Sequence, residues 1–395
     1  MTYGGDHRGY QPPSGPRQPP RGPRRHQAAQ MMPLPGREAA PRRPVRSGPP
    51  PRQAPPRQAP PRQAPPRPAG PPPRQTLSRR RRRWNPGKVL LSLLMVFVLF
   101  VAGVWVYLEF SINRIDALPE YEGRPAAAEG TNWLIVGSDS RAGLDPEDEA
   151  RLSTGDTGGQ RTDTIMLAHL PDNDTPPILL SLPRDSRVPI PGHGTNKINA
   201  AFSFGGAALL VRTVEQATGL RIDHYAEIGF GGFAAIVDAI GGVEMDIPEE
   251  MHDSMTGVTI PAGRQELDGA QALGFVRMRY SSATPRSDLD RVANQRKFIG
   301  ALVSEMSGPG TLLNPFHLFP LLSTAPDALT MDTGDHLHNL VGLAWAMRGI
   351  SSGGVVTGTV PVTSGSAERW DKAKAQQLFK ALRTDQPVPD SLIVN

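Results

Sequence analysis

A run of twenty residues without a charge constrains this chain more than any other feature. From Val89 to Leu108 the one clearly polar side chain is Ser92, and Arg79–Arg83 stand a few positions before the run. Twenty residues in an α-helix rise about 30 Å, which is the thickness of the hydrocarbon core of a bilayer. Helices of soluble proteins rarely run that long without a charge. We therefore predict a transmembrane helix over residues 89–108.

The arginines before this run predict its orientation, because basic residues beside a membrane span stay on the cytoplasmic side. Residues 1–88 would lie inside the cell and residues 109–395 outside it, in a single-pass protein of the cell membrane. A cleaved signal peptide is the competing interpretation. It would have a shorter apolar run, small residues at a cleavage site and a far shorter preceding segment. The run ends instead in Trp105-Val106-Tyr107-Leu108, which favours an uncleaved anchor.

Residues 1–88 differ in composition from the rest of the chain. They hold 20 of its 43 Lys and Arg but 2 of its 38 Asp and Glu, a formal charge of +18, which leaves −13 on the remainder. Pro-Pro-Arg-Gln-Ala recurs between Pro50 and Ala64, and such a composition favours extended, disordered segments. We expect a cytoplasmic tail that rests on anionic lipid. A docking segment for a partner that binds proline-rich sequences is the alternative.

Because the basic charge belongs to this tail, the composition does not indicate a nucleic acid as partner of the whole chain. The chain also has no cysteine. Disulfides, thiolate metal sites and a cysteine nucleophile are therefore excluded.

The remainder of the chain predicts one layered α/β domain. Apolar runs at Trp133–Val136, Ile165–Leu170 and Ile178–Leu182 predict buried strands, and apolar residues at helical spacing predict a helix over Ala200–Thr218. Buried strands that alternate with helices are typical of a sheet covered by helices. Further helices are predicted over 233–240, 268–273, 288–306, 340–349 and 367–383, and further strands over 243–247 and 275–280.

This domain is expected in three parts. A stalk would span residues 109–130, and the core of the domain would span residues 131–310. Residues 311–395 would add helices and strands to the same domain. A chain of this length and mixed pattern is enough for one sizeable core.

Two aspartates stand at the ends of neighbouring predicted strands. Asp139 follows the first strand and Asp163 precedes the second, so a reversal of the chain brings them together. Two carboxylates at one place repel each other unless a cation lies between them. An all-oxygen site suits Mg²⁺. For each aspartate taken alone, capping of a turn is the alternative role.

Polar residues also follow the third predicted strand. Arg184 and Asp185 come directly after it, and ligand sites of layered α/β sheets lie at such strand ends. Lys197 and Asn199 precede the helix from Ala200, where a helix start and a lysine favour an anion. An ordinary N-terminal cap is the alternative for this second group.

The predicted strand Phe-Val-Arg-Met-Arg-Tyr would carry Arg277 and Arg279 on the same face. In the helix after it, Asp288, Arg291 and Gln295 stand at i, i+3 and i+7 and also share a face. Guanidinium groups bind phosphate oxygens in a planar, bidentate manner. Arginines from both elements are therefore expected to converge on a phosphate. A salt-bridged surface is the alternative, but it does not explain two arginines on one face of an apolar segment.

Taken in order, these motifs resemble the LytR–CpsA–Psr family of cell-wall glycopolymer ligases over residues 131 to about 306. The long segment between the two aspartates, with Gly158-Gly159, is similar to the actinobacterial branch. The motifs that carry the resemblance are Leu134–Arg141, Arg161–Leu167, Ser181–Asp185, Lys197–Phe202, Gly205-Gly206, Gly241–Val243, Leu267–Leu273, Arg277–Arg279 and Asp288–Arg291 with Gln295.

The resemblance implies a transferase. Such enzymes take a glycopolymer, for example a teichoic acid, from a polyprenyl-pyrophosphate carrier and join it through a phosphodiester to a sugar hydroxyl of peptidoglycan. By position, Asp139 and Asp163 would hold Mg²⁺, and an apolar channel would hold the prenyl chain. The expected pyrophosphate ligands are Arg184, Arg277, Arg279, Arg291 and Gln295, with Arg161, Lys197 and Asn199 as further candidates for substrate binding.

The expected chemistry uses the same residues. The pyrophosphate bond supplies the energy that ATP cannot supply outside the cell, and positive groups would neutralise the charge that grows on the leaving prenyl phosphate. Two other functions stay open: a pyrophosphatase that hydrolyses the same donor, and a membrane-anchored wall- or lipid-binding regulator without turnover. The candidate catalytic residues are Arg184, Arg277, Arg279 and Arg291, with Asp185 and Asp288 as candidates for the general base.

Overall fold

The described part of the chain begins just before the predicted membrane helix. The computed structural model describes residues 85–139, 162–253, 258–278, 281, 284, 288–363 and 368–394, with the backbone alone at 288 and 289. The predicted disordered tail lies outside these residues up to position 84. The residues from 85 onward belong to one compact unit.

A long apolar helix opens this unit. Helix α1 spans Pro86–Ser111 and contains the predicted run. Of the helices in the described ranges, it is the one that is long and apolar enough to cross a membrane. Its end is fixed to the rest of the unit, because Ile112 is buried and the Glu109 carboxylate accepts a hydrogen bond from the Leu337 N–H at 2.9 Å. The helix is consistent with a single-pass membrane anchor.

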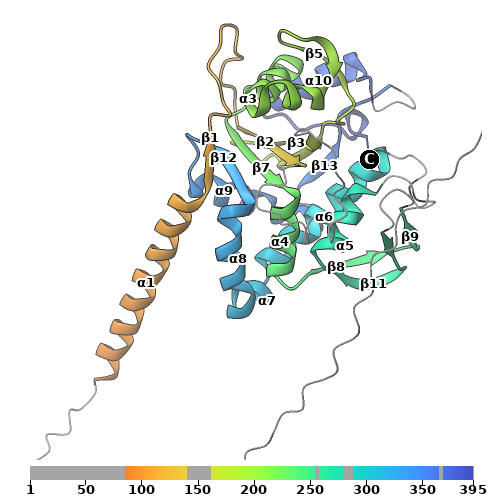
Figure 1. The fold of residues 1–395 in the computed structure, drawn as a ribbon. Coiled ribbons are helices and arrows are strands. Elements are labelled where there is room, and N and C mark those ends of the chain that lie inside the picture. The colour runs from red at the N-terminus through yellow and green to blue at the C-terminus, as the bar shows by residue number, and fades with distance from the viewer. Residues whose placement is uncertain are drawn as a thin grey trace, which may run out of the picture. The chain divides into compact units, whose positions relative to one another are not determined.

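A seven-stranded mixed sheet lies at the centre of the domain (Figure 1). Its strands are β1 (Asn113–Ile115), β2 (Thr131–Ser138), β3 (Thr162–Leu170), β4 (Ile178–Ser181), β7 (His224–Gly229), β12 (Leu329–Asp332) and β13 (Val356–Thr359). They lie in the order β1-β12-β7-β2-β3-β4-β13. Strands β7 and β2 run parallel, whereas β2, β3 and β4 alternate in direction. The three strands predicted from the first apolar runs are β2, β3 and β4, and they are neighbours in the sheet.

Helices cover both faces of this sheet, as the α/β pattern predicts (Figure 1). They are α3 (Ile198–Thr218), α4 (Phe230–Ala239), α5 (Gly269–Arg277), α6 (Asp288–Ser307), α7 (Pro309–Leu312), α8 (Pro315–Ala328), α9 (Leu337–Met347) and α10 (Lys372–Arg383). One face packs Leu134 and Leu167 against α3 and α10. The opposite face carries Trp133 and Met166 toward α9. Helices α4, α5, α6 and α8 form a further apolar cluster.

Three short antiparallel pairs complete the fold. They are β5 (Arg187–Ile190) with β6 (Gly194–Lys197), β8 (Val243–Ile247) with β11 (Gly263–Leu267), and β9 (Met251–His252) with β10 (Thr259–Ile260). The first pair places Lys197 at the start of α3, and the second packs Val243 and Leu267 into the cluster of α4 and α5.

Residues 109–130, expected as a stalk, take part in the packing of the domain. Strand β1 pairs in parallel with β12 and forms an edge of the sheet. Ala117 is buried, and Arg124 forms an ion pair with the buried Glu215 of α3, with 3.0 Å between Nε and Oε1. This segment therefore joins the end of α1 to the sheet through an edge strand and a buried charge pair.

The strand predicted around Arg277 is wrong, because α5 continues to that residue. Asp268 starts the helix with a capping box, and Phe275 and Met278, three positions apart, are both buried in the cluster of α4 and α6. A short apolar run cannot be assigned to strand or helix by periodicity alone. Arg277 and Arg279 therefore do not share a strand face as predicted, and Arg279 lies outside the described residues.

The other predicted helices and strands are present, with ends displaced by a few residues. The helix expected over Ala200–Thr218 is α3, which ends at Gly219 in the left-handed conformation, with φ 68°. Gly205 and Gly206 interrupt it with non-helical dihedrals, a kink that the apolar spacing did not indicate.

Candidate active site

A cavity of about 580 Å³ lies between the sheet and the helices on one of its faces. Its walls come from the central strands and from α4, α5, α6, α8 and α9. Most of its lining is apolar. Its charged and polar lining residues are Asp163, Thr164, Arg184, Asp253, Arg277, Arg291 and Gln295. Five of the predicted site residues therefore line a single cavity.

The two predicted metal ligands lie at the same end of the β2–β3 pair. Asp139 follows β2 directly, and the predicted reversal of the chain is confirmed by the antiparallel pairing. The register shifts between Gly137 and Ser138, so Asp163 stands opposite no residue of β2 and lines the cavity. Such bulges re-aim side chains beside functional sites. The segment between the aspartates, which includes Arg161, lies outside the described residues.

Arg184, in the turn after β4, contacts the second of these aspartates. Its Nη1 donates a hydrogen bond to Asp163 Oδ1, and its Nε lies 3.6 Å from Asp185 Oδ2. Lys197 Nζ lies 2.6 Å from Asp185 Oδ1, and the Asn199 N–H donates to the Arg184 carbonyl at 3.2 Å. Asp185, Lys197 and Asn199 do not line the cavity. They hold the backbone and the guanidinium of Arg184, which does line it.

Helices α5 and α6 add two more arginines to the cavity wall. The Arg277 guanidinium carbon lies 4.6 Å from the centroid of the Phe230 ring, a cation–π contact. Arg291 and Gln295, one turn apart on α6, are buried and line the cavity, as their spacing predicted. Gln295 Nε2 donates to the Val276 carbonyl at 3.1 Å and so ties α6 to the end of α5.

These groups lie at the strand ends that carry the aspartates. Phe230, which Arg277 covers, directly follows Gly229, and Gly229 pairs with Ser138 at the end of β2. Along α6 the lining then changes from polar to apolar. The apolar lining of that helix consists of Ile299, Leu302, Val303 and Met306. The cavity therefore has a charged end at the sheet and an apolar end between α6, α8 and α9.

Asp253 is a lining residue that the sequence did not predict. This residue is buried, lines the cavity and follows the short strand β9. Its N–H donates to the Val258 carbonyl at 3.0 Å. Strand β9 is only two residues long, so neither an apolar run nor a helical spacing in the sequence marked Asp253. Asp288 begins α6, but its side chain is not among the described ones, and Arg279 and Arg161 are not described at all.

Asp163 lines the cavity and Asp139 does not, and the two carboxylates would need a phosphate ligand to complete the shell of a Mg²⁺ ion. Within the described ranges, no cluster of three or more His, Asp or Glu side chains could hold a metal alone. Mg²⁺ sites, however, commonly use one or two carboxylates together with substrate phosphates and water. Asp139 and Asp163 supply that number. Arg184, bonded to Asp163, offsets part of the repulsion between them.

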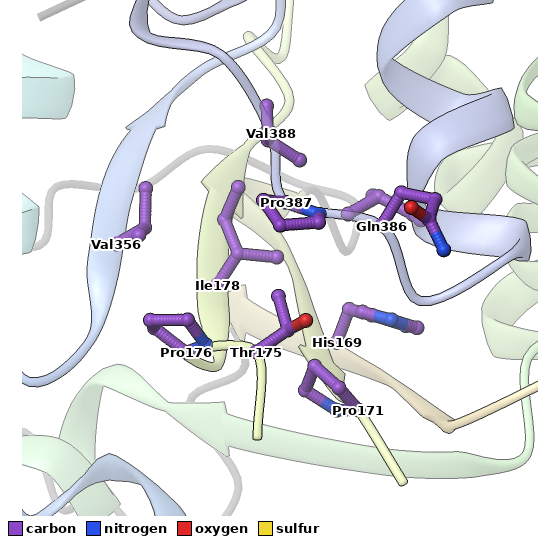
Figure 2. A pocket seen from close by; sticks show the side chains of 10 residues that line it. His169, Pro171, Thr175, Pro176, Ile178, Val356, Gln386, Pro387 and Val388 are labelled. Carbon is purple, nitrogen blue, oxygen red and sulfur yellow. The ribbon is translucent and has the colours of Figure 1, made fainter. Parts of the chain in front are cut away.

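A second, smaller cavity of about 180 Å³ lies beside the start of β4 and the C-terminal segment (Figure 2). Its lining is apolar or uncharged apart from His169. His169 Nδ1 lies 2.9 Å from Asn132 Oδ1, and its Nε2 lies 2.9 Å from Asp385 Oδ1. Burial lowers the pKa of His169, against the opposing effect of the Asp385 carboxylate. Because both ring nitrogens are bonded, this cavity presents a structural histidine, and the larger cavity is the candidate site.

Comparisons with known proteins show which family this chain is similar to. The LytR_cpsA_psr family model matches residues 110–386. A protein of Corynebacterium glutamicum named "Probable cell wall biosynthesis protein LcpB" is 52% identical over 304 residues, 75% of this chain and 70% of that protein. TagU of Enterococcus faecalis, a polyisoprenyl-teichoic acid–peptidoglycan teichoic acid transferase, is 32% identical over 229 residues, 57% of this chain and 73% of that one.

A solved structure supports the fold. The LytR-Csp2A-Psr enzyme from Actinomyces oris superposes with a TM-score of 0.54 at 23% identity, over 69% of this chain and 96% of that one. At this identity the likeness concerns the fold alone. It confirms the predicted layered α/β class.

Proposed function

Because the chain belongs to the LytR–CpsA–Psr family, we propose that it transfers a glycopolymer from a polyprenyl-pyrophosphate carrier to a sugar hydroxyl of peptidoglycan. The observation that carries this proposal is the two-ended cavity, with three arginines at one end and an apolar wall at the other. A polyprenyl pyrophosphate has the same division, a charged head on a long apolar chain. The relatives named as cell wall biosynthesis proteins and teichoic acid transferases support the same class of substrate.

The arginines suit the head of such a donor. Arg184 reaches the cavity from the turn after β4, Arg277 from α5 and Arg291 from α6, so their guanidinium forks can surround one pyrophosphate. Gln295 adds an amide to the same wall. The ion pairs behind Arg184 fix its position before the ligand arrives, which lowers the reorganisation needed in the transition state.

In the proposed reaction, the hydroxyl oxygen of the acceptor attacks the phosphorus that bears the glycopolymer. The phosphoanhydride bond breaks, and prenyl phosphate leaves with its electron pair. Arg184, Arg277 and Arg291 would stabilise the negative charge on the phosphates. Asp139 and Asp163 would hold Mg²⁺, which when bound supplies further positive charge toward the same oxygens.

The proton of the attacking hydroxyl requires a base. Asp185 is a candidate from the sequence, but its two cationic partners and its place behind Arg184 suit a positioning role. Asp288 stays the other sequence candidate. Asp253 joins them, since it is a buried carboxylate in the cavity wall.

The proposed reaction belongs outside the cytoplasmic membrane. The arginine run before α1 favours a cytoplasmic N-terminus and an extracellular domain. There, the anhydride of the lipid carrier supplies the driving force, and α1 keeps the domain beside a donor that stays in the bilayer.

A transfer assay tests the proposal. The full chain in lipid bilayers would receive a synthetic polyprenyl-pyrophosphate donor, purified peptidoglycan and Mg²⁺. We expect Arg291→Lys and Arg184→Lys, which keep the charge but lose the fork, to slow transfer by about 10²-fold or more. Asp163→Asn should in addition weaken the dependence of the rate on Mg²⁺ concentration.

A matched control comes from the same segment as Arg277. Met278→Leu conserves volume at a buried position that does not line the cavity, so its rate should stay near that of the unchanged chain. If the arginine variants match this control, the cavity is not the site. Release of prenyl phosphate without peptidoglycan would favour the pyrophosphatase, and tight donor binding without turnover would favour the regulator.

A further inference from the structure

Helices beside the membrane anchor expose large apolar side chains to their surroundings. Leu313, after α7, and Phe316, on α8, are 81% and 83% exposed. We call the whole set the apolar patch. It consists of Leu312, Leu313, Phe316 and Phe319 around α7 and α8, with Val341 and Trp345 one turn apart on α9. Exposed apolar patches of this kind mark interaction surfaces for proteins or membranes.

The apolar patch lies beside the helix that is suited to span the membrane. Helix α8 runs alongside α1 in Figure 1, and the rings of Phe319 and Phe100 pack edge to face with 6.3 Å between centroids. Phe100 stands eleven residues before Ser111, which is about 16 Å along a helix. It belongs to the run that must lie in hydrocarbon if α1 spans a bilayer. Phe319 then lies at the depth of the acyl chains as well.

The sequence around the patch is compatible with that depth. From Met306 to Pro326 no residue is Asp, Glu, Lys or Arg, although Glu305 and Asp327 flank the stretch. A charged side chain inside hydrocarbon is costly. Insertion into a bilayer therefore requires a segment without charges, and this segment has that composition. Helices satisfy their own backbone groups, and Asn314 Oδ1 accepts a hydrogen bond from the Phe316 N–H at 3.0 Å at the start of α8.

Helix α9 supplies a residue pair typical of the membrane surface. The Arg348 guanidinium carbon lies 3.7 Å from the centroid of the exposed Trp345 ring. Tryptophan is enriched where hydrocarbon meets headgroups, and arginine there reaches lipid phosphate. The patch therefore has an apolar part along α1 and an interfacial pair on α9.

We propose that α7, α8 and the exposed face of α9 dock into the bilayer. They enter the leaflet that faces the domain. This inference rests on the proposed function and on α1 as the membrane anchor. Met306, Ala325 and Val341 line the apolar end of the cavity and belong to these elements or adjoin them. The docked patch thus places that end against the acyl chains. The prenyl chain of the donor then reaches the cavity directly from the leaflet.

The absence of cysteine makes a direct test simple. Single cysteines at Leu313→Cys and Phe316→Cys would be labelled with an environment-sensitive fluorophore in the full chain. The protein would be placed in vesicles of phosphatidylcholine and phosphatidylglycerol. Quenching of the fluorophore by iodide in the water would be compared with quenching by nitroxides on the lipid acyl chains. Phe97→Cys within α1 is the control for lipid, and Gln377→Cys, exposed on α10, is the control for water.

We expect the fluorophores at positions 313 and 316 to be quenched by nitroxide and not by iodide, like the fluorophore at position 97. Iodide quenching equal to that at Gln377 would overturn the proposal. Protection from both quenchers would also overturn it, because the patch would then be covered by protein. The readout needs no turnover, so its failure is distinguishable from a failure of the proposed function.

A functional variant completes the test. Leu313→Glu combined with Phe316→Glu adds charge at exposed positions outside the cavity wall. It should slow transfer several-fold from a donor embedded in bilayers, and much less from the same donor in detergent. Gln377→Glu should change neither rate. Equal loss in bilayers and detergent would contradict a docking role for the patch.

Discussion

At the scale of single residues, Glu215 shows how this fold keeps a charge in its interior. The side chain is fully buried in α3. Its carboxylate accepts hydrogen bonds from Arg124 Nε at 3.0 Å, from the Tyr121 hydroxyl at 2.8 Å and from the Ile222 N–H at 3.0 Å. Burial and this carboxylate together raise the pKa of Tyr121, so the phenol remains a donor. A buried charge of this kind is stable only while its partners are present.

Removal of Arg124 should therefore be costly. We expect Arg124→Ala to lower the free energy of unfolding by about 3–5 kcal/mol, because Glu215 would stay buried without its cation. Arg221→Ala is the matched control. Its contacts with Glu120 and Asp223, at 3.7 and 3.8 Å, are partly exposed, so the loss should stay below about 1 kcal/mol. Urea unfolding of the full chain in detergent measures both, and equal losses would contradict the assignment.

At the scale of elements, the cavity depends on how closely α4 approaches α8. A Cβ added at Gly232 of α4 would lie 2.6 Å from the Cα of Ala328 at the end of α8. The helices therefore touch through backbone atoms at this point. Phe230, Phe233 and Ala325, which line the cavity, belong to the same two helices. The contact thus sets the spacing of one wall of the site.

A pair of glycine variants tests this contact. Gly232→Ala should destabilise the domain by about 1–3 kcal/mol, because the backbone of α8 must move to admit the methyl group. Gly342→Ala, on α9 with open space around it, should be neutral or stabilise by up to about 1 kcal/mol through helix propensity. Thermal unfolding of both variants measures the two changes in stability. A stable Gly232→Ala variant would show that α8 moves freely relative to α4.

At the scale of the whole molecule, charge is divided by the apolar run of α1. The first 88 residues carry +18 and the remainder −13, out of a total of +5. Basic residues resist transfer across the membrane and set the orientation of a neighbouring span.

The orientation predicts the outcome of a fusion experiment. A reporter enzyme that works only outside the cytoplasm, joined after Asn395, should be active in cells. The same reporter joined after Asn85, directly ahead of α1, should be inactive. An inactive but stably produced fusion after Asn395 would place the domain in the cytoplasm, where the proposed wall chemistry has no acceptor.

Several features of this protein followed from the sequence by itself. The long apolar helix is a local property, because a run of twenty uncharged residues suits hydrocarbon wherever the rest of the chain lies. The antiparallel pairing that puts Asp139 and Asp163 at the same end of β2 and β3 needed only one chain reversal between adjacent strands. Arg291 and Gln295 share the cavity because a regular helix places i and i+4 side by side.

The tertiary structure decided what depends on distant segments. The order of the sheet, with β7 and β12 beside β2, and the cavity between the sheet and five helices could not be read from periodicity. The run around Arg277 folds as a helix because Phe275 and Met278 pack against α4 and α6, and packing overrides a short alternating pattern. Asp253 joins the site for a similar reason. Its segment has no period of its own, and only the surrounding elements place its carboxylate in the wall.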